Sequence, residues 1–342
     1  MLNLEMYRKD KKTNISIYGL GNFGYALLKH FDKKLGINIV SGYDRNKTLL
    51  AHLMKERSHL SLYKEHRVSK NVIFAKNTKE LLADCNILVL ASPSHATREV
   101  IKKVKPYLTE GILIVNTAKA LDYQTGKRLS EIIKKELNSK DYKYALFAGG
   151  TIASDLFKQE PLGATLACED KEVLSKLVKI FESPNLHVYP SSDLSGVEYA
   201  SAFKNVVSIL AGIIKGMGFS FGSETHIITV IADEIENIVT SRLGGNKETF
   251  SMISQAWGND LWMSCMGPTR NREFGVLLGK GFSVSDSLSN MKKQRKVVEG
   301  VNTIAILNKV VPLNDYPLLK YLYSLIIEKN IKAEAIKKII FK

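Results

Sequence analysis

The sequence predicts an α/β domain built on a doubly wound, mostly parallel sheet, followed by an all-α domain. Three observations indicate this organisation. Strand-like and helix-like stretches alternate up to about residue 190, helical periodicity dominates from residue 191 onward, and the chain has 342 residues. One hydrophobic core usually serves no more than roughly 250 to 300 residues. We therefore expect a tail at residues 1–12, an α/β domain at 13–190 and a helical domain at 191–342.

The first predicted strand leads into a glycine-rich turn. Residues 15–18 alternate in a β-prone pattern, and a helical stretch follows at residues 25–31. In a dinucleotide site the first glycine allows a tight turn, the second lets the backbone approach the pyrophosphate, and the third permits close helix packing. The helix N-terminus then faces the phosphates. This order predicts a Rossmann-type cofactor site that contains Gly19, Gly21, Asn22, Phe23 and Gly24.

The second strand is predicted at residues 37–40, and the residues Asp44 and Arg45 that follow it bear on the choice of cofactor. Asp44 lies where a carboxylate hydrogen-bonds the adenosine ribose and disfavours a 2′-phosphate, which favours NAD. Arg45 gives the opposite signal, because a guanidinium accepts a 2′-phosphate. NAD is therefore the expected cofactor, and NADP stays open.

The rest of the first domain continues the alternation. Strands are predicted at 72–74, 87–91, 112–116, 144–147, 164–167 and 187–189, and helices at 79–83, 97–105, 128–137 and 171–181. Near-continuous apolar strands such as residues 87–90 suit a sheet that is covered on both faces. Because ligands bind at the carboxyl ends of such strands, the loops that contain Pro93 and Lys119 are candidate site loops.

The second domain shows helical periodicity only. Helices are predicted at 197–216, 224–242, 270–278, 295–307, 317–327 and 332–340. The longest apolar run, residues 206–219, is interrupted by Lys215 and falls short of the about 18 uncharged apolar residues of a membrane span. We expect a buried helix there and no integral membrane segment. Residues 1–12 lack the apolar core of a secretory signal.

Charge and cysteine content narrow the class of protein. The formal net charge is +15, but the lysines are spread through the chain without the interleaved aromatic residues of a nucleic-acid site. We expect a solvated lysine-rich surface and no nucleic-acid partner. Cys85, Cys168 and Cys265 are widely spaced among apolar or small residues, which favours reduced, buried thiols in the cytoplasm and no metal site.

Motifs beyond the glycine turn recur in a fixed order. They are Ala91-Ser92-Pro93-Ser94, Thr117-Ala118-Lys119, Thr125-Gly126-Lys127, Gly196-Val197-Glu198, Lys204-Asn205-Val206, Asp260-Leu261 with Cys265, Arg270-Asn271 with Phe274-Gly275, and Val297-Val298-Glu299-Gly300-Val301. From Gly19 to about Ala305 the chain resembles the NAD(P)-dependent glycerol-3-phosphate dehydrogenases of the soluble bacterial type. The resemblance implies a homodimer that interconverts dihydroxyacetone phosphate and sn-glycerol 3-phosphate with NAD(P)H, for glycerophospholipid synthesis.

The chemistry of an alcohol dehydrogenation requires a proton acceptor while hydride leaves the carbon. A lysine serves if burial and a second cation such as Lys119 lower its pKa, and Lys204 lies in an apolar helical run. The resemblance assigns the acid/base role to Lys204, with Asp260 orienting the ammonium and Lys119 polarising the substrate oxygen. Without the resemblance, each residue has a simpler interpretation. A single lysine on a helix is usually solvated, and Asp260, which follows Gly258-Asn259, is placed as a helix cap would be.

Phosphate recognition requires fixed donors. Arg270 and Asn271 open a predicted helix and combine a guanidinium fork, an amide and helix N-terminal amides. The resemblance matches them to the substrate-phosphate site and adds Asn205 and Ser264 as polar contacts. On the cofactor side it carries over Pro93, Lys119, Ala153, Arg270 and Glu299.

The chain also departs from the family pattern. The cofactor loop reads Gly149-Gly150-Thr151-Ile152-Ala153, where the family usually has a proline and an aromatic residue, and their loss loosens the loop. Ala120 and Asn259 replace usual glycines, and Ser264 replaces a usual threonine. Two alternatives stay open: a paralogous dehydrogenase for another phosphorylated or acidic hydroxy compound, and a non-catalytic NAD-binding regulatory protein.

Overall fold

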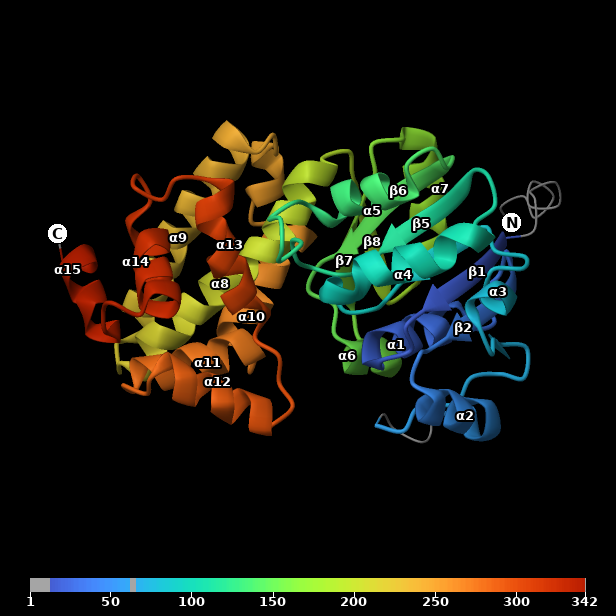
Figure 1. Ribbon diagram of the computed structural model, residues 1–342, viewed down its shortest axis with the longest axis horizontal. Coiled ribbons are helices and arrows are strands. Elements are labelled where there is room, and N and C mark those ends of the chain that lie inside the picture. The colour runs from blue at the N-terminus through green and yellow to red at the C-terminus, as the bar shows by residue number, and fades with distance from the viewer. Residues whose placement is uncertain (1–12, 62–65, 342) are drawn as a thin grey trace. The chain divides into compact units, whose positions relative to one another are not determined.

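The computed structural model describes residues 13–61 and 66–341, so the tail expected at residues 1–12 lies outside the described residues. The chain forms two compact units (Figure 1). The first contains the chain up to Ala118 together with Ser130–Ser192, and the second contains Lys119–Leu129 and the chain from Asp193 onward.

The first unit is built on a sheet of eight strands in the order β3-β2-β1-β4-β5-β6-β7-β8 (Figure 1). The strands are β1 Thr13–Tyr18, β2 Ile37–Tyr43, β3 Ile73–Phe74, β4 Ile87–Leu90, β5 Ile112–Asn116, β6 Tyr142–Ala148, β7 Leu162–Ala167 and β8 Leu186–Ser191. Neighbouring strands are parallel except β6 and β7, which are antiparallel. The doubly wound, mostly parallel sheet is confirmed, and β1 lies at its switch point between β2 and β4.

Helices cover both faces of this sheet. They are α1 Asn22–Phe31, α2 Lys47–Glu56, α3 Thr78–Leu81, α4 Thr97–Val104, α5 Leu129–Leu137, α6 Ala153–Lys158 and α7 Lys171–Phe181. Ile87 and Val89 of β4 belong to the hydrophobic cluster that includes residues of α1, α2 and α7, whereas Leu88 and Leu90 belong to the cluster with residues of α3, α4 and α5. Alternate side chains of one strand therefore enter two cores, which explains its continuous apolar sequence.

The second unit is helical from Asp193 onward in the part that the structure describes. Its α-helices are α8 Leu194–Gly216, α9 Phe221–Arg242, α10 Asp260–Met266, α11 Arg270–Gly279, α12 Val284–Lys293, α13 Glu299–Val310, α14 Pro317–Tyr323 and α15 Lys337–Ile340. Short 3₁₀ or π turns are η4 Lys247–Phe250, η5 Gln255–Asn259, η6 Ser324–Glu328 and η7 Ala333–Ile336. The prediction of a helix at 295–307 is wrong in its start, since α13 begins at Glu299.

Helix α8 forms the centre of the second unit. It is the one described helix that is long and apolar enough to cross a membrane, yet the whole apolar stretch is buried within the protein core. Helix α11 packs closely against it through glycines, because a Cβ at Gly212 would lie 2.1 Å from the carbonyl oxygen of Arg272. This approach brings residues on α8 next to the start of α11.

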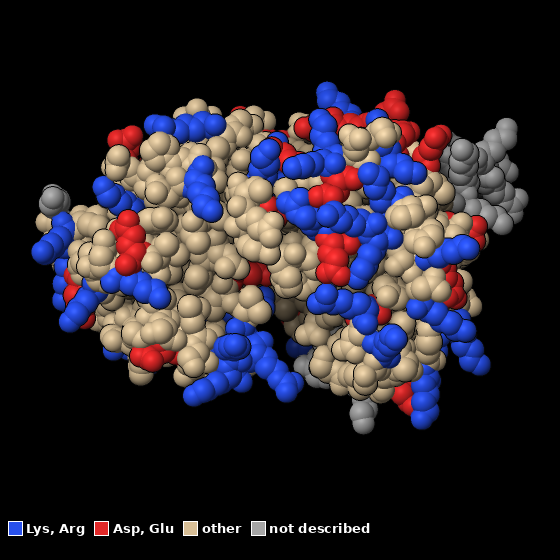
Figure 2. Space-filling model, in the orientation of Figure 1, with Lys and Arg blue, Asp and Glu red and all other residues tan. Residues whose placement is uncertain are grey.

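Lysine and arginine side chains are scattered over the surface. On the face in Figure 2 they occur on both units, with aspartate and glutamate side chains among them. A net charge of +15 distributed in this way attracts anionic small molecules without forming one basic stripe on the face shown.

Candidate functional site

The three predicted catalytic residues meet in the second unit. The Asp260 carboxylate is fully buried, and its Oδ1 accepts a hydrogen bond from Lys204 Nζ at 2.5 Å while its Oδ2 accepts one from Lys119 Nζ at 3.0 Å. Lys204 lies on α8, and Asp260 is the first residue of α10. Asp260 therefore does not act as the cap that its position after Gly258-Asn259 suggested, because its carboxylate binds two ammonium groups.

The charges of this cluster depend on one another. Burial alone raises the pKa of Asp260, but the positive charges of Lys119 and Lys204 outweigh it, so the pKa of Asp260 lies below its usual value. Burial lowers the pKa of Lys119, and the charge of Lys204 lowers it further against the opposing attraction of Asp260. The cluster thus holds an ionised carboxylate beside a lysine that releases its proton more readily than usual.

Lys119 is held within the second unit by the segment that follows it. Arg128 Nη1 pairs with Glu198 Oε2 at 3.4 Å, and its guanidinium carbon lies 6.0 Å from the centre of the Tyr199 ring. Leu121 is buried in the helical core, and Asp122 accepts hydrogen bonds from the backbone and hydroxyl of Thr125. These contacts fix the loop that presents Lys119.

Ser264 joins the cluster from α10. Its hydroxyl accepts a hydrogen bond from Lys204 Nζ at 2.8 Å, and its carbonyl oxygen accepts bonds from the hydroxyls of Ser208 and Thr269, both at 2.7 Å. Ser264 therefore supplies a second oxygen, beside Asp260, that holds the Lys204 ammonium. The bonds to its carbonyl tie the end of α10 to α8.

The predicted phosphate-binding residues lie at the start of α11. Asn271 Nδ2 donates to Asn205 Oδ1 at 2.9 Å, and Asn271 Oδ1 accepts from the backbone of Gly300 at 3.0 Å. Both amide side chains are thus oriented by neighbouring helices, while Arg270 is exposed as the first residue of α11. Glu299 opens α13, and its negative charge opposes the lowering of the pKa of Lys119.

The glycine turn of the first unit has the geometry that the fingerprint requires. Gly19 has φ +99°, and a Cβ on Gly24 would lie 1.9 Å from the carbonyl oxygen of Gly19. Gly21 faces open space, with nothing within 4 Å of the position of a Cβ. Asn22 and Phe23 then begin α1, whose N-cap residue makes no side-chain hydrogen bond. The first-turn amides are consequently left for a phosphate.

Asp44 performs a structural task that its sequence position did not suggest. Its Oδ2 accepts a hydrogen bond from the backbone N–H of Leu20 at 2.7 Å, and its Oδ1 accepts one from Asn46 at 2.7 Å. The carboxylate thereby fastens the glycine turn to the end of β2. Arg45 is largely exposed and lies 3.9 Å from Glu99.

His59 is a residue that the sequence analysis missed. It is buried, its Nε2 lies 2.9 Å from the carbonyl oxygen of Leu20, and its Nδ1 lies 3.2 Å from the backbone nitrogen of Ser61. Burial lowers the pKa of His59, which matches a neutral ring that donates from Nε2 and accepts at Nδ1. Asp44 and His59 thus hold both backbone polar groups of Leu20. No motif around His59 in the sequence would have revealed this role.

The remaining cofactor-side residues lie in loops of the first unit. Pro93 precedes a short 3₁₀ turn, Ser94–Ala96, after β4, and Ala153 is the first residue of α6. In the altered loop, Gly149 has φ +125°, and the Thr151 hydroxyl is buried with no hydrogen-bond partner among the described residues. The structure thus groups the fingerprint, Asp44, Pro93 and Ala153 within the first unit, and the lysine–aspartate cluster within the second.

The chain is similar to known proteins along most of its length. Residues 14–174 match the family described as NAD-dependent glycerol-3-phosphate dehydrogenase N-terminus, and residues 193–337 match its C-terminus. A Clostridium tetani protein named glycerol-3-phosphate dehydrogenase, NAD(P)+, is 31% identical and covers 85% of this chain and 82% of its own. One of the same name from Halothermothrix orenii is 33% identical, covering 84% and 82%. The crystal structure of glycerol-3-phosphate dehydrogenase from Coxiella burnetii has a TM-score of 0.84 at 22% identity, covering 97% and 99%.

Proposed function

Because the chain belongs to the NAD-dependent glycerol-3-phosphate dehydrogenase family, we propose that it interconverts dihydroxyacetone phosphate and sn-glycerol 3-phosphate with NAD or NADP. The observation that carries this proposal is the buried carboxylate of Asp260 between the ammonium groups of Lys119 and Lys204. Supply of glycerol 3-phosphate for phospholipid synthesis is the role consistent with this reaction.

Proton transfer falls to Lys204 in this proposal. When the ketone is reduced, the carbonyl oxygen gains a proton, and Lys204 Nζ is the proposed donor; in the reverse direction it accepts the hydroxyl proton. Asp260 stays ionised because the two lysines lower its pKa, and it holds the Lys204 ammonium in place. Lys119, on the other oxygen of Asp260, is proposed to polarise the substrate oxygen.

The cofactor proposal is supported by the glycine turn. The crowded Gly19 and Gly24, the open space at Gly21 and the N-terminus of α1 fit the pyrophosphate of a dinucleotide. The bound nicotinamide supplies or accepts the hydride. Pro93, Ala153, Arg270 and Glu299 are proposed as further residues on the cofactor side.

The substrate phosphate is proposed to bind at the start of α11. The N-cap residue Thr269 makes no side-chain cap hydrogen bond, so the first amides of α11 are left for an anion beside the exposed Arg270. Asn271 and Asn205, which hydrogen-bond each other, complete the polar set together with Ser264.

The test follows NADH absorbance, with NADPH in parallel, when purified protein meets dihydroxyacetone phosphate. We expect rapid oxidation that falls by about 10²- to 10⁴-fold in Lys204→Ala, the usual range for a lost general acid. Lys215→Ala changes an exposed lysine of the same helix and is the matched control. Turnover of only another hydroxy compound would favour a paralogous dehydrogenase, and NADH binding without any turnover would favour a regulatory protein.

We also propose that the protein is a cytoplasmic homodimer with domains at 13–190 and 191–342. The three cysteines are free and buried, as suits a reducing compartment. Exposed phenylalanines of the second unit, Phe282 and Phe341, are apolar surface that a second copy would cover. Light scattering of the purified protein measures the assembly mass, and limited proteolysis maps the domain boundary. A mass of one chain would contradict the dimer.

A further inference from the structure

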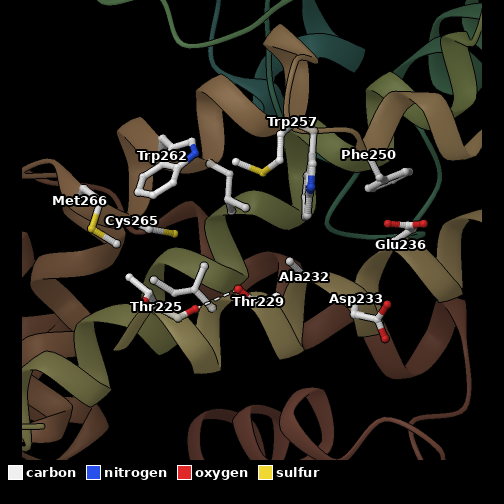
Figure 3. Close-up of a pocket in the computed structure, with 13 residues that line it drawn as sticks. Thr225, Thr229, Ala232, Asp233, Glu236, Phe250, Trp257, Trp262, Cys265 and Met266 are labelled. Atoms are coloured by element: carbon white, nitrogen blue, oxygen red, sulfur yellow. Dashed lines mark hydrogen bonds between the residues drawn. The ribbon is translucent and has the colours of Figure 1, made fainter. Parts of the chain in front are cut away.

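A cavity in the second unit lies apart from the lysine–aspartate cluster. Its volume is about 260 Å³, and it lies among α9, η4, η5 and α10 (Figure 3). Ligand pockets typically hold about 300–1,000 Å³, so this cavity suits a small organic molecule. No step of the reaction described above uses it.

Aromatic rings form much of the cavity wall. Phe250 and Trp257 are buried and pack edge to face, with ring centres 5.0 Å apart, whereas Trp262 is half exposed. Figure 3 shows Trp257 and Trp262 across from the α9 residues Thr225, Thr229 and Ala232. The cavity therefore has aromatic surface on one side and a helix on the other.

Acidic residues supply all of its charge. Asp233 and Glu236 on α9 are the charged residues among those that line the cavity, although the chain carries a net charge of +15. Both lie toward the Phe250 end in Figure 3. Glu236 pairs with the highly exposed Lys247 at 3.7 Å, a surface contact that a bound cation can replace.

This combination selects a class of ligand. Aromatic faces attract cations through the ring quadrupole, apolar walls favour alkyl groups, and the two carboxylates disfavour anions. We propose that the cavity is an effector site for an organic cation with an apolar body, such as an alkylammonium or a quaternary ammonium compound.

Helix α10 connects this site to the catalytic cluster. Leu261, Trp262 and Cys265 line the cavity. On the same helix, Asp260 and Ser264 hold the ammonium of Lys204. A ligand that contacts the cavity side of this seven-residue helix alters the position of the groups that orient Lys204. The binding claim is independent of the reaction, whereas the effect on turnover rests on the proposed function.

Intrinsic fluorescence provides a direct probe. The chain has two tryptophans, and both line the cavity. The full-length protein is titrated with hexyltrimethylammonium, with hexanol as the neutral compound and hexanesulfonate as the anion of equal chain length. We expect a saturable change with the cation at a concentration at least about tenfold lower than with the other two. No saturable change, or an equal response to all three, would overturn the proposal.

Charge-removing variants locate the binding. Glu236→Gln and Asp233→Asn keep the shape of the side chains and are each expected to raise the Kd for the cation by about threefold to tenfold. Glu248→Gln, an exposed residue of the neighbouring η4 turn that does not line the cavity, is the matched control and is expected to leave the Kd unchanged. Equal effects of all three variants would show general screening and would contradict a built site.

Turnover and assembly complete the test. The cation is added to the NADH and dihydroxyacetone phosphate assay, and we expect kcat or KM to change with the same concentration dependence as the fluorescence. Cation binding without any turnover would leave the effector site standing and defeat the proposed function, whereas turnover without cation binding would do the reverse. Binding that leaves turnover unchanged would overturn the coupling through α10. The remaining outcome is a dimer that does not bind the cation and that dissociates when Trp262→Glu is introduced. This outcome would show that a second copy of the chain, and not an organic cation, covers the cavity, and it would overturn the proposal.

Discussion

The two units assemble their sites from the sequence in different ways. In the first, Gly19, Gly21 and Gly24 lie within one turn between β1 and α1, so their spacing alone predicts the geometry. In the second, Asp260 lies 141 residues from Lys119 and 56 residues from Lys204. The packing of α8 against α10 brings Lys204 to Asp260, and the loop that follows Lys119 is held on α8 through Arg128 and Glu198. A local site can therefore be recognised from residue spacing, whereas an assembled site depends on the whole helical core.

The largest effect is expected from breaking the assembled site at Asp260. Asp260→Asn removes the counter-charge of the buried Lys204 and the partly buried Lys119 ammonium groups while keeping the side-chain shape. Removing one partner of a buried ion pair typically costs about 3–5 kcal/mol, so urea denaturation should show a loss of this size in the free energy of unfolding. Turnover of dihydroxyacetone phosphate should fall by at least about a hundredfold.

The control for this prediction is a carboxylate of the same unit at the surface. Asp315 is exposed and lies 3.7 Å from Arg242, and Asp315→Asn is expected to change the free energy of unfolding by less than about 1 kcal/mol. Equal stability of the two variants would show that the buried cluster does not hold the helices together.

The first unit also contains a polar contact between residues far apart in the sequence, so long-range assembly is not confined to the second unit. His30 on α1 has its Nε2 2.7 Å from the carbonyl oxygen of Phe181, 151 residues away, and burial, assisted by the charge of Lys34, lowers the pKa of His30 to about 4. The unfolded chain, with a histidine pKa of about 6.5, takes up this proton first. The free energy of unfolding should therefore fall by about 3 kcal/mol between pH 6.5 and 4 and gain no further dependence from this group below that.

The His30→Gln variant isolates this dependence. Urea denaturation at a series of pH values should show a shallower loss of stability for this variant between about pH 6.5 and 4 than for the parent protein. His187→Gln, which changes an exposed histidine of β8, should reproduce the parent profile. Identical profiles for all three proteins would mean that His30 titrates in the folded state as it does in the unfolded chain.

The local site is tested by two glycines of one turn. In Gly24→Ala the new methyl group meets the backbone oxygen of Gly19 at 1.9 Å, so we expect a loss of about 1–3 kcal/mol in the free energy of unfolding. Gly21→Ala places a methyl group in open space, so stability should change little while NADH affinity falls, because the cofactor backbone must approach there. Thermal denaturation and NADH titration separate the two effects, and unchanged NADH affinity in Gly21→Ala would remove the turn from the cofactor site.

Sequence patterns predicted the sheet better than the polar helices. Strand β5 and helix α7 have the predicted bounds, because apolar runs and periodicity mark them clearly. Helices α2 and α12 escaped prediction since few apolar side chains face the core; α12 buries only Val284, Ser287 and Met291. Helix α10 also escaped, because it is a single short helix that continues the π turn η5.

The sequence indicated the residues of the candidate site and, through the family resemblance, the contact of Asp260 with the Lys204 ammonium, but not the other contacts. The order of the motifs indicated Lys119, Lys204 and Asp260, yet no spacing shows that one carboxylate binds both lysines. The same limit applies to the two contacts of the Leu20 backbone. Its N–H meets Asp44 because β1 and β2 pair side by side, and its carbonyl oxygen meets His59 because the loop after α2 folds back. Side-chain chemistry limits what a residue can bind, and only the tertiary fold decides which partner it meets.

The smallest expected effect concerns Asp44. This residue combines the two kinds of site, because it accepts one hydrogen bond from the nearby Asn46 and one from Leu20, which lies 24 residues away. Asp44→Ala removes the negative charge that disfavours a 2′-phosphate, so the ratio of kcat/KM for NADPH to that for NADH should rise by about tenfold. Arg45→Ala removes an exposed cation at the neighbouring position and should lower the same ratio. Because Asp44 also accepts hydrogen bonds from Leu20 and Asn46, an equal loss with both cofactors would show that it acts only by fastening the glycine turn.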